Sequence, residues 1–317
     1  MKVFHNTVEA TTFLKNGSVV AIGNFDGVHF GHQAILKSAH EYAQKHKLKL
    51  CVLTFDPHPV KILAPQVAPV SLQTISQKIE CLQAHFVDAV VLQKFDMPFS
   101  KISPHDFFKE HLIQNLKTKA IFVGYDFTFG KKRSGTTETL EQLAVENQVT
   151  LHITPAQMQG HALVSSTMIR KLLYSGELQA ASRYLTRPYA IDGSVVHGFK
   201  RGTALGIHTA NLNAENELAL SDGVYATQVA LKNKTYNAVT NIGLNPTFDN
   251  TTRSIETHIF DFDQEIYDQK LRLHFVQKLR EEIKFANVQA LLKQIEKDIT
   301  QAKKILCGKP KLSTPIK

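Results

Sequence analysis

The stretch from Gly23 to His32, which reads Gly-Asn-Phe-Asp-Gly-Val-His-Phe-Gly-His, most constrains what this chain can fold into. It follows an apolar run at 18–22 that is typical of a buried strand, and a segment with helical apolar spacing comes after it. Where a strand turns into a helix, free backbone N–H groups and the positive end of the helix dipole face the ligand. Gly31 lets a phosphate approach the backbone, and His29 and His32 can donate hydrogen bonds to it. The stretch therefore predicts a nucleotide-phosphate site.

The surroundings of the two histidines matter because the string His-x-Gly-His is short. It can arise by chance, and the chain holds 15 histidines. The strand before it, the helix after it and the lead-in at 24–27 supply the structural context that such a motif requires. We therefore expect this turn to bind the nucleotide through Gly23, Phe25, Asp26 and Gly31.

The net charge limits the class of partner. Lysine and arginine number 37 against 28 aspartates and glutamates, which gives +9, and a basic surface attracts nucleic acid or phosphorylated small molecules. The basic residues are spread along the chain, apart from 131–133 and a lysine-rich C-terminus, and there is no arginine-rich arm or aromatic ladder for stacking bases. We therefore expect small-molecule substrates and no nucleic acid.

The cysteines and the hydropathy pattern indicate the compartment. No stretch approaches the length of a membrane span, and the first residues contain no apolar leader segment. Cys51, Cys81 and Cys307 are scattered without C-x-x-C spacing, which is typical of thiols in a reducing cytosol and indicates no zinc site. We expect a cytoplasmic protein that does not associate with membranes.

The two halves of the chain differ in their pattern of predicted strands and helices, and a length of 317 residues favours about two domains. From 18 to about 155, short apolar strands alternate with helices, which predicts an α/β fold with a parallel, doubly wound sheet. After 187, short alternating strands separated by turns predict a small antiparallel barrel, followed by an amphipathic helix near the C-terminus. We expect domains at 1–186 and 187–306, and a flexible tail at 307–317.

Several polar residues follow the predicted strands of the first half, at the edge of the sheet where ligands bind. Asp126 could orient a ligand, and Phe129 beside it belongs either to a pocket or to the core. His58 lies between two prolines, where shaping the loop is the simpler role. Ser165, Ser166 and Thr167 open a helix that contains Arg170 one turn on. They form either a helix cap or, as their position after the last strand favours, a phosphate site.

The second half holds a different set of chemical groups. Thr209 and Asn211 alternate on one side of an extended segment, and their oxygens are suitable ligands for Mg²⁺ bound to a nucleotide. Glu256 lies in an otherwise apolar strand, where it could accept a hydroxyl proton during phosphoryl transfer. The alternative is that Glu256 is an ordinary outward-facing strand residue.

These motifs together resemble the prokaryotic bifunctional riboflavin kinase/FAD synthetases, from about residue 15 to 306. The nucleotidyltransferase motif of that family is matched by Gly23–His32, and the segments that fall in order behind it are 54–59, 124–130 and 165–170. The kinase module is matched by Thr209-Ala210-Asn211, Gly223-Val224-Tyr225, the segment 241–248 and Glu256.

The resemblance implies two consecutive ATP-dependent reactions. The barrel would phosphorylate riboflavin to FMN, with Glu256 as general base and with Gly206, Thr209 and Asn211 binding the Mg²⁺-nucleotide. The first domain would then adenylylate FMN to FAD and pyrophosphate. There His29 and His32 would stabilise charge on the phosphates and the segment 165–170 would clamp them. His58, Asp126 and Phe129 would line the flavin pocket.

The chain departs from the family pattern at three places. Ile207-His208 replaces the usual Phe-Pro, which should leave the nucleotide-binding segment more flexible, since proline fixes φ. Thr203 and Met168 each stand where an arginine is common. These departures leave open an adenylyltransferase whose barrel only binds flavin. The basic charge and the His-x-Gly-His string leave open a second alternative, a nucleic-acid-binding module. A homo-oligomer is also possible.

Overall fold

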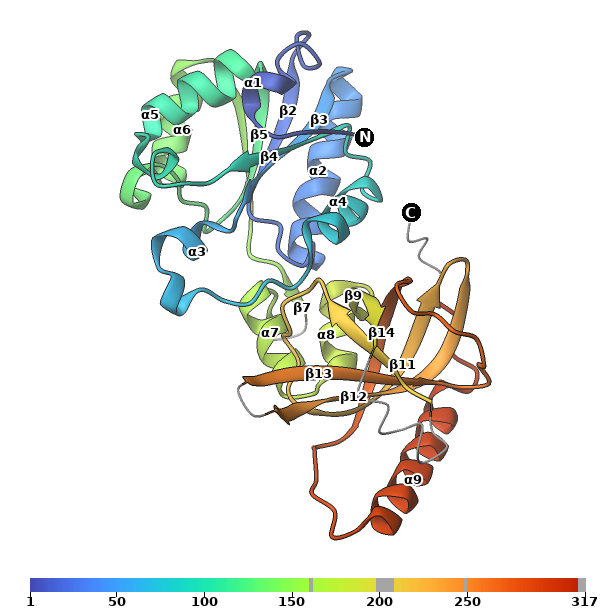
Figure 1. Ribbon diagram of the computed structural model, residues 1–317. Coiled ribbons are helices and arrows are strands. Elements are labelled where there is room, and N and C mark those ends of the chain that lie inside the picture. Colours follow the sequence, from blue (N-terminus) through green and yellow to red (C-terminus); the bar gives the residue numbers. More distant parts are fainter. Residues whose placement is uncertain (160–161, 198–207, 248–249, 313–317) are drawn as a thin grey trace. The chain divides into compact units, whose positions relative to one another are not determined.

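The computed structural model, drawn in Figure 1, describes residues 1–159, 162–197, 208–247 and 250–312. The chain forms two compact units. The first contains Met1–Pro69 and Ile75–Ser166, and the second contains Val70–Thr74 and Thr167–Lys317. The short segment Val70–Thr74 therefore belongs to the second unit although it lies in the first half of the sequence.

The first unit is built on a six-stranded parallel sheet. Its strands lie in the order β1 (Lys2–Phe4), β4 (Ala89–Lys94), β3 (Lys49–Asp56), β2 (Ser18–Ile22), β5 (Thr118–Gly124) and β6 (Thr150–Thr154). All neighbouring strands run parallel. The order proceeds from β2 toward β1 on one side and toward β6 on the other, so it reverses beside β2. Open α/β sheets bind their ligands at such a reversal.

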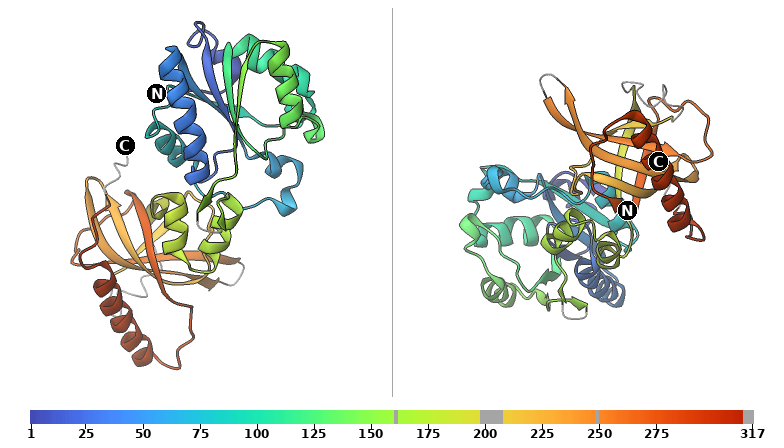
Figure 2. Two further views of the ribbon diagram at one scale, coloured as in Figure 1. Left: turned by 180° about the vertical axis from the view of Figure 1, so that it is seen from behind. Right: turned by 90° about the horizontal axis from the view of Figure 1, so that it is seen from below.

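Helices cover both faces of this sheet (Figure 2). The helical segments are α1 (Thr7–Ala10), α2 (Phe30–His46), α3 (Pro59–Leu63), α4 (Ile75–Gln83), α5 (Pro104–Asp106), a π-helix (Phe107–Asn115), α6 (Thr137–Glu146) and the 3₁₀ turns Pro65–Val67, Phe99–Lys101 and Lys131–Arg133. Val19 and Ala21 of β2 pack toward α2 and α4, while Val20 and Ile22 pack toward the π-helix and α6. Because both faces are covered, every residue of β2 is buried. The predicted doubly wound parallel sheet is confirmed.

The second unit is a closed antiparallel barrel with helices. Its strands lie in the order β10 (Ala210–Ala214), β13 (Asn250–Ile259), β12 (Lys234–Thr247), β11 (Gly223–Leu231), β14 (Lys270–Arg280) and β9 (Tyr189–Val196). The remaining elements are α7 (Ser166–Tyr174), α8 (Leu178–Leu185) and α9 (Val288–Leu306), and a two-stranded ribbon of β7 (Met158–Gln159) and β8 (Ala162–Leu163) precedes them in the first unit.

Alternating residues divide the barrel strands between two cores. Tyr225 and Val229 of β11 join the large core, which also contains the apolar faces of α7 and α8. Ala226 lies between them in the sequence and packs instead with Ala302 and Leu306 of α9, on the outer face of the barrel. The predicted antiparallel barrel with a C-terminal helix is confirmed.

The two compact units meet along the chain at Ser166 and Thr167. Helices α7 and α8 therefore pack with the barrel, although they precede the domain boundary predicted at 186/187. As a division between functions, that boundary stays a prediction. Within the segment predicted as a tail, Leu312 donates its N–H to Gln228 Oε1 (3.3 Å) and accepts from Thr235 Oγ1 (2.7 Å).

A buried histidine makes the stability of the barrel pH-dependent. His274 on β14 is 6% exposed, and neither ring nitrogen has a hydrogen-bond partner in the part of the chain that the structure describes. Burial, with a smaller contribution from Arg272, lowers its pKa to about 4. An unfolded histidine has a pKa of about 6.5. Between these values the unfolded state binds the proton and the folded state does not, so acid favours unfolding.

We therefore expect the barrel to lose up to about 3 kcal/mol of stability as the pH falls from 6.5 to 4. His274→Leu removes the titrating group and should flatten this part of the pH dependence. Thermal unfolding at pH 7 and pH 5 measures it, with the exposed His197 replaced by Leu as the matched control. Parallel pH dependences for the His274 variant and the unmodified protein would contradict this account.

Candidate functional sites

The turn between β2 and α2 has an unusual backbone. Phe25, Gly27 and Val28 have φ angles of 47°, 86° and 38°, in the left-handed region that residues with a side chain rarely adopt. Phe25 and Val28 are nonetheless fully buried. Gly23 starts the turn and donates its N–H to Leu53 O of β3 (3.2 Å). Strain of this kind persists only where the surroundings fix the backbone, and it gathers at ligand sites.

Four side chains of the first unit fix the carbonyl groups of this turn. Asn24 O accepts hydrogen bonds from both Thr54 Oγ1 (3.1 Å) and Lys78 Nζ (2.8 Å). The two further pairs are Ser166 Oγ to Asp26 O (2.8 Å) and Gln33 Nε2 to Val28 O (2.9 Å). The hydroxyl of Ser166, which was predicted to bind phosphate, thus holds the turn itself.

The two candidate catalytic histidines stand together at the start of α2. His29 immediately precedes the helix and His32 lies in its first turn. Their rings stack with centroids 3.7 Å apart and planes at 19°. A side chain at Gly31 would meet the His29 ring at 3.2 Å, so the glycine makes room for this imidazole. Both rings therefore lie where the N–H groups and dipole of a long helix favour an anion.

The sequence analysis missed a buried lysine beside this turn. Lys78 of α4 is 7% exposed and donates to Asn24 O. Burial lowers the pKa of Lys78, while the carboxylates of Asp26 and Asp56 oppose that shift and Lys61 adds to it. The only sequence signal for Lys78 was its position in the amphipathic segment 75–83. A lysine in such a helix is usually solvated, so this signal does not predict a buried lysine.

The other residues predicted for this site lie in varied surroundings. Asp126 is exposed after β5, whereas Phe129 is 7% exposed and packs against Phe107 in the core of the first unit. His58 Nδ1 accepts the Val60 N–H (3.3 Å) and caps α3. Ser165 is half-buried in the first unit.

Thr167 and Arg170 fall in the second unit. Thr167 is exposed, and Arg170 Nε donates to the carbonyl oxygen of Val70 (2.6 Å) in that same unit. The structure thus gives Arg170 a partner in the short segment Val70–Thr74, and its role toward a phosphate stays a prediction.

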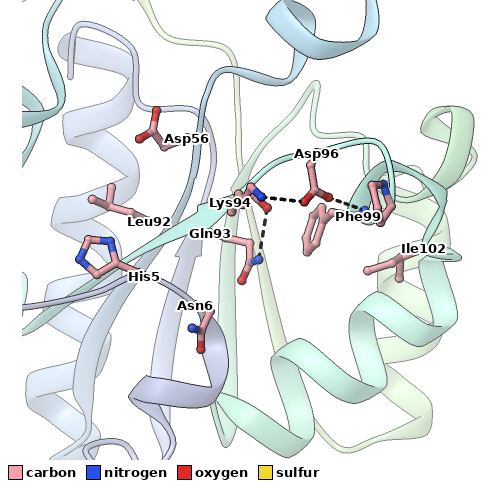
Figure 3. Close-up of a pocket in the computed structure, with 10 residues that line it drawn as sticks. His5, Asn6, Asp56, Leu92, Gln93, Lys94, Asp96, Phe99 and Ile102 are labelled. Carbon is pink, nitrogen blue, oxygen red and sulfur yellow. Dashed lines mark hydrogen bonds and ion pairs between the residues drawn. The ribbon is translucent and has the colours of Figure 1, made fainter.

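A cavity of about 800 Å³ opens at the carboxyl ends of β3 and β4 (Figure 3). Its lining mixes apolar and polar side chains, namely His5, Asn6, Asp56, Leu92, Gln93, Lys94, Asp96, Pro98, Phe99 and Ile102. Lys94 and Asp96 form an ion pair there (3.4 Å). None of the residues predicted to line a flavin pocket belongs to this lining, although Asp56 is two residues from His58.

The candidate site of the second unit is a row of polar residues across three strands. Glu256 of β13 lies directly opposite Asn211 of β10 on one side and Asn241 of β12 on the other. Directly opposed residues on adjacent strands have Cβ atoms about 5 Å apart. The structure therefore brings together the predicted base and a predicted metal ligand, and adds Asn241, which the sequence analysis had placed only within a motif.

This row faces the outside of the barrel. Ile255 and Ile259 of β13 point into the large core, whereas Phe260 packs with α9 on the outer face. Glu256 shares the outward parity and is half-buried. Glu256 does face outward, as the alternative to a catalytic role had it. Asn211 faces the same way, so the outward orientation keeps the two side chains together on one surface.

Thr209 immediately precedes β10 and is held on both sides. Ala210 after it pairs with Thr257 of β13. His208 before it accepts a hydrogen bond at its backbone oxygen from His258 Nδ1 (2.8 Å). The flexibility expected from His208 is thus opposed by a side-chain hydrogen bond. Gly206 and Thr203 lie outside the described residues.

Glu282 is a second carboxylate near this row. A side chain at Gly243 of β12 would collide with the Glu282 carboxylate, and the Asn241 amide lies on the same side of that glycine. The glycine in the Asn-Ile-Gly segment was the only sequence signal for this close approach.

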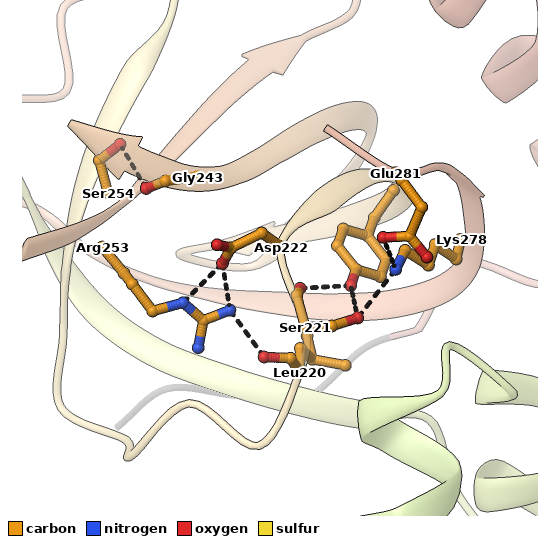
Figure 4. Close-up of polar contacts among 9 residues, drawn as sticks. Leu220, Ser221, Asp222, Gly243, Arg253, Ser254, Lys278 and Glu281 are labelled. Carbon is orange, nitrogen blue, oxygen red and sulfur yellow. Dashed lines mark hydrogen bonds and ion pairs between the residues drawn. The ribbon is translucent and has the colours of Figure 1, made fainter. Parts of the chain in front are cut away.

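Polar contacts with β13 and β14 fix the loop at 220–222, which precedes β11 (Figure 4). Arg253 Nε donates to Asp222 Oδ1 (2.7 Å), and Lys278 Nζ donates to Ser221 Oγ (2.8 Å). Gly223 follows with φ +148°, and a side chain there would meet the Arg280 carbonyl oxygen at 2.6 Å. The Gly223-Val224-Tyr225 motif therefore starts β11 at a place where only glycine fits.

The oxygen atoms of this row and of the adjacent Thr209 suit a hard cation. Threonine hydroxyl, asparagine carbonyl and glutamate carboxylate oxygens are the ligand types that Mg²⁺ prefers. Within the described ranges, no group of three or more histidines, cysteines, aspartates or glutamates could hold a metal ion. By their chemistry, the oxygen atoms of Thr209, Asn211 and Glu256 fit a magnesium ion.

Each unit thus has its own candidate site, a strained turn at a helix start in the first and a carboxylate–amide row in the second. Family descriptions match both parts of the chain: FAD synthetase over residues 12–168 and riboflavin kinase over residues 185–306. No helix among the described residues is long and apolar enough to cross a membrane.

Known proteins resemble the chain over most of its length. The bifunctional riboflavin kinase/FMN adenylyltransferase of Buchnera aphidicola is 35% identical over 92% of this chain and 95% of its own. That of Escherichia coli K12 is 34% identical over 93% of each chain. A Streptococcus pneumoniae crystal structure described as a macrolide-efflux protein is 30% identical, with a TM-score of 0.82 over 90% of this chain and 94% of its own. The chain belongs to the family of bifunctional riboflavin kinase/FMN adenylyltransferases.

Proposed function

We propose that the chain makes FAD from riboflavin in two ATP-dependent steps. The barrel transfers the γ-phosphate of ATP to the riboflavin 5′-hydroxyl, giving FMN and ADP. The sheet unit transfers AMP from a second ATP to FMN, giving FAD and pyrophosphate. The observation that carries the proposal is that the two family descriptions match in succession, each over a part of the chain with its own candidate site.

In the kinase step, Glu256 acts as general base. Its carboxylate takes the 5′-hydroxyl proton as that oxygen attacks the γ-phosphorus, and the bond from the γ-phosphorus to the bridging oxygen of ADP breaks. The position of Glu256 opposite Asn211 supports this role, because it places the base beside the residue proposed to hold the nucleotide.

Magnesium would be held with the nucleotide by the hydroxyl of Thr209 and the amide oxygen of Asn211. When bound, the ion would neutralise charge on the β- and γ-phosphates. Gly206 is proposed to bind the same nucleotide. The fixed backbone on both sides of Thr209 supports the assignment.

In the adenylyl step, a phosphate oxygen of FMN attacks the α-phosphorus of ATP and pyrophosphate leaves. His29 and His32 donate hydrogen bonds to the charge that develops on the phosphates, so no covalent enzyme intermediate is needed. The turn residues Gly23, Phe25, Asp26 and Gly31 shape this site. Ser165, Ser166, Thr167 and Arg170 are proposed to contribute to phosphate binding.

For the flavin ring of FMN, His58, Asp126 and Phe129 remain proposed contacts. The cavity beside β3 and β4 is a second candidate for the flavin-binding pocket, because Leu92, Phe99 and Ile102 offer apolar surface to a planar ring. The substrates are small molecules. The absence of nucleic-acid partners, a homo-oligomer and a cytoplasmic location stay predictions.

Labelled ATP separates the two reactions. With riboflavin and γ-labelled ATP, the label should enter FMN and the FMN half of FAD. With α-labelled ATP, FAD should be the labelled flavin, and FMN should carry no label. FMN free of γ-label would contradict the kinase step, and FAD free of α-label would contradict the adenylyl step.

The hydrogen bond from His258 to His208 gives a further prediction for the kinase. His258→Ala should raise KM for Mg-ATP in FMN formation by about fivefold, since one neutral hydrogen bond is lost. His258→Asn should restore it, because the asparagine amide nitrogen matches Nδ1, whereas His258→Gln should not. Steady-state kinetics of FMN formation measure this, and FAD formation from supplied FMN is the internal control. Equal KM values for the Asn and Gln variants would count against the assigned hydrogen bond.

A further inference from the structure

Lys78 is a buried charge that the proposed mechanism does not use. Its side chain is 7% exposed and comes from α4, far in the sequence from the histidine motif. Burying an ammonium group disfavours folding, and the carboxylates of Asp26 and Asp56 offset that only in part, since the pKa of Lys78 is lowered overall. An apolar residue of similar length would be easier to bury.

The hydrogen bond made by Lys78 identifies the group that its charge stabilises. Its ammonium group donates to the carbonyl oxygen of Asn24 (2.8 Å), which also accepts from Thr54 Oγ1 (3.1 Å). Asn24 immediately precedes Phe25, which has a φ of 47°. A charged donor forms a stronger hydrogen bond than a neutral one, and this one acts on the carbonyl group immediately before the first strained residue of the turn.

The turn in question sets the position of the reacting groups. From Asn24 it passes through Phe25, Gly27 and Val28, all at positive φ, and ends at His29 before α2. Two non-glycine residues in the left-handed region need outside contacts to stay there. A change in the anchor at Asn24 would therefore move the backbone that carries His29 and His32.

We propose that Lys78 is a positioning residue of the adenylyl-transfer site, whose buried ammonium group fixes the Asn24 carbonyl and thereby the strained turn that places His29 and His32. The inference rests on the proposed function of the first unit. It assigns no bond making to Lys78, which acts through the backbone. It also explains why a charge is kept where an apolar side chain would pack more easily.

The test is Lys78→Met, which keeps the length of the side chain and removes the charge. We expect kcat for FAD formation from FMN to fall about a hundredfold, the size of effect that a misplaced site produces. The thermal unfolding temperature should stay the same or rise, since no charge is buried. FMN formation by the same preparation should be unchanged. Lys45→Met, at an exposed position on α2, is the matched control and should retain both reactions.

A second variant keeps the inference testable if Lys78→Met folds poorly. Lys78→Ala leaves space that propylammonium can enter, so this cation should restore FAD formation and propanol, of similar shape but neutral, should not. The inference is overturned by a folded Lys78→Met protein with unchanged kcat, or by equal rescue of Lys78→Ala with propanol. If the unmodified protein makes no FAD from FMN, it is the proposed function that fails.

Discussion

Glu256→Gln is expected to reduce FMN formation from riboflavin by a hundredfold or more, about the contribution of a general base. The substitution keeps the size of the side chain and its place opposite Asn211, but the amide cannot accept the hydroxyl proton. FAD formation from supplied FMN should be unchanged, because it occurs in the other unit. Product formation from each substrate, resolved by HPLC, measures both reactions.

The matched control for this variant is Glu215→Gln. Glu215 is an exposed carboxylate of the barrel unit, in an ion pair with Lys270 (2.9 Å), and exposed ion pairs contribute little to stability. Both reactions should survive this change. FMN formation that persists in Glu256→Gln would remove Glu256 as the base, whatever the control shows.

The second large effect is expected at the helix start of the first unit. His29→Ala and His32→Ala should each lower kcat for FAD formation about a hundredfold, the effect of removing one preorganised hydrogen-bond donor. The stacked rings, 3.7 Å apart, should make the double variant less than additive. FMN formation should be unaffected. The measurement is the initial rate of FAD formation from FMN and ATP.

The control for the histidine variants lies on the same helix. His46 is exposed in the last turn of α2 and stacks only on Tyr42 among the aromatic side chains of the described residues. His46→Ala should therefore retain FAD formation. Undiminished FAD synthesis by His29→Ala or His32→Ala would reject the role assigned to that histidine.

Much of the fold could be predicted from local pattern alone. The run 18–22, the glycine turn and the helix that follows are set by hydrophobic periodicity and turn chemistry, and the structure has them as β2 and α2. The barrel strands were predicted from alternation in the same way. By contrast, β1 is three residues long, and it pairs with β4, which begins far along the sequence at Ala89. No local signal could therefore predict this strand.

The helical segment between β4 and β5 illustrates a finer limit, because the sequence analysis predicted only that strands alternate with helices there. The structure has three residues of α-helix and then a π-helix from Phe107 to Asn115. Periodicity shows that the segment is helical but not how its hydrogen bonds are spaced. Tertiary contacts decide that, and they include His111 Nδ1 at 2.9 Å from Thr7 Oγ1.

The candidate sites show the same division. Glu256 and Asn211 were chosen by residue type, and their meeting across β10 and β13 depends on a register that sequence does not display. Lys78 could not be chosen at all, because a lysine on an amphipathic helix is ordinarily solvated. Its burial arises only when α4 packs beside the turn after β2.

The central claim is that one chain carries both reactions, and the most direct measurement is a time course from riboflavin and Mg-ATP, with FMN and FAD resolved by HPLC. The account predicts that FMN appears first and that FAD follows as FMN is consumed. Riboflavin that stays unchanged while supplied FMN is converted to FAD would contradict it, and would leave the barrel as a flavin-binding unit beside an adenylyltransferase.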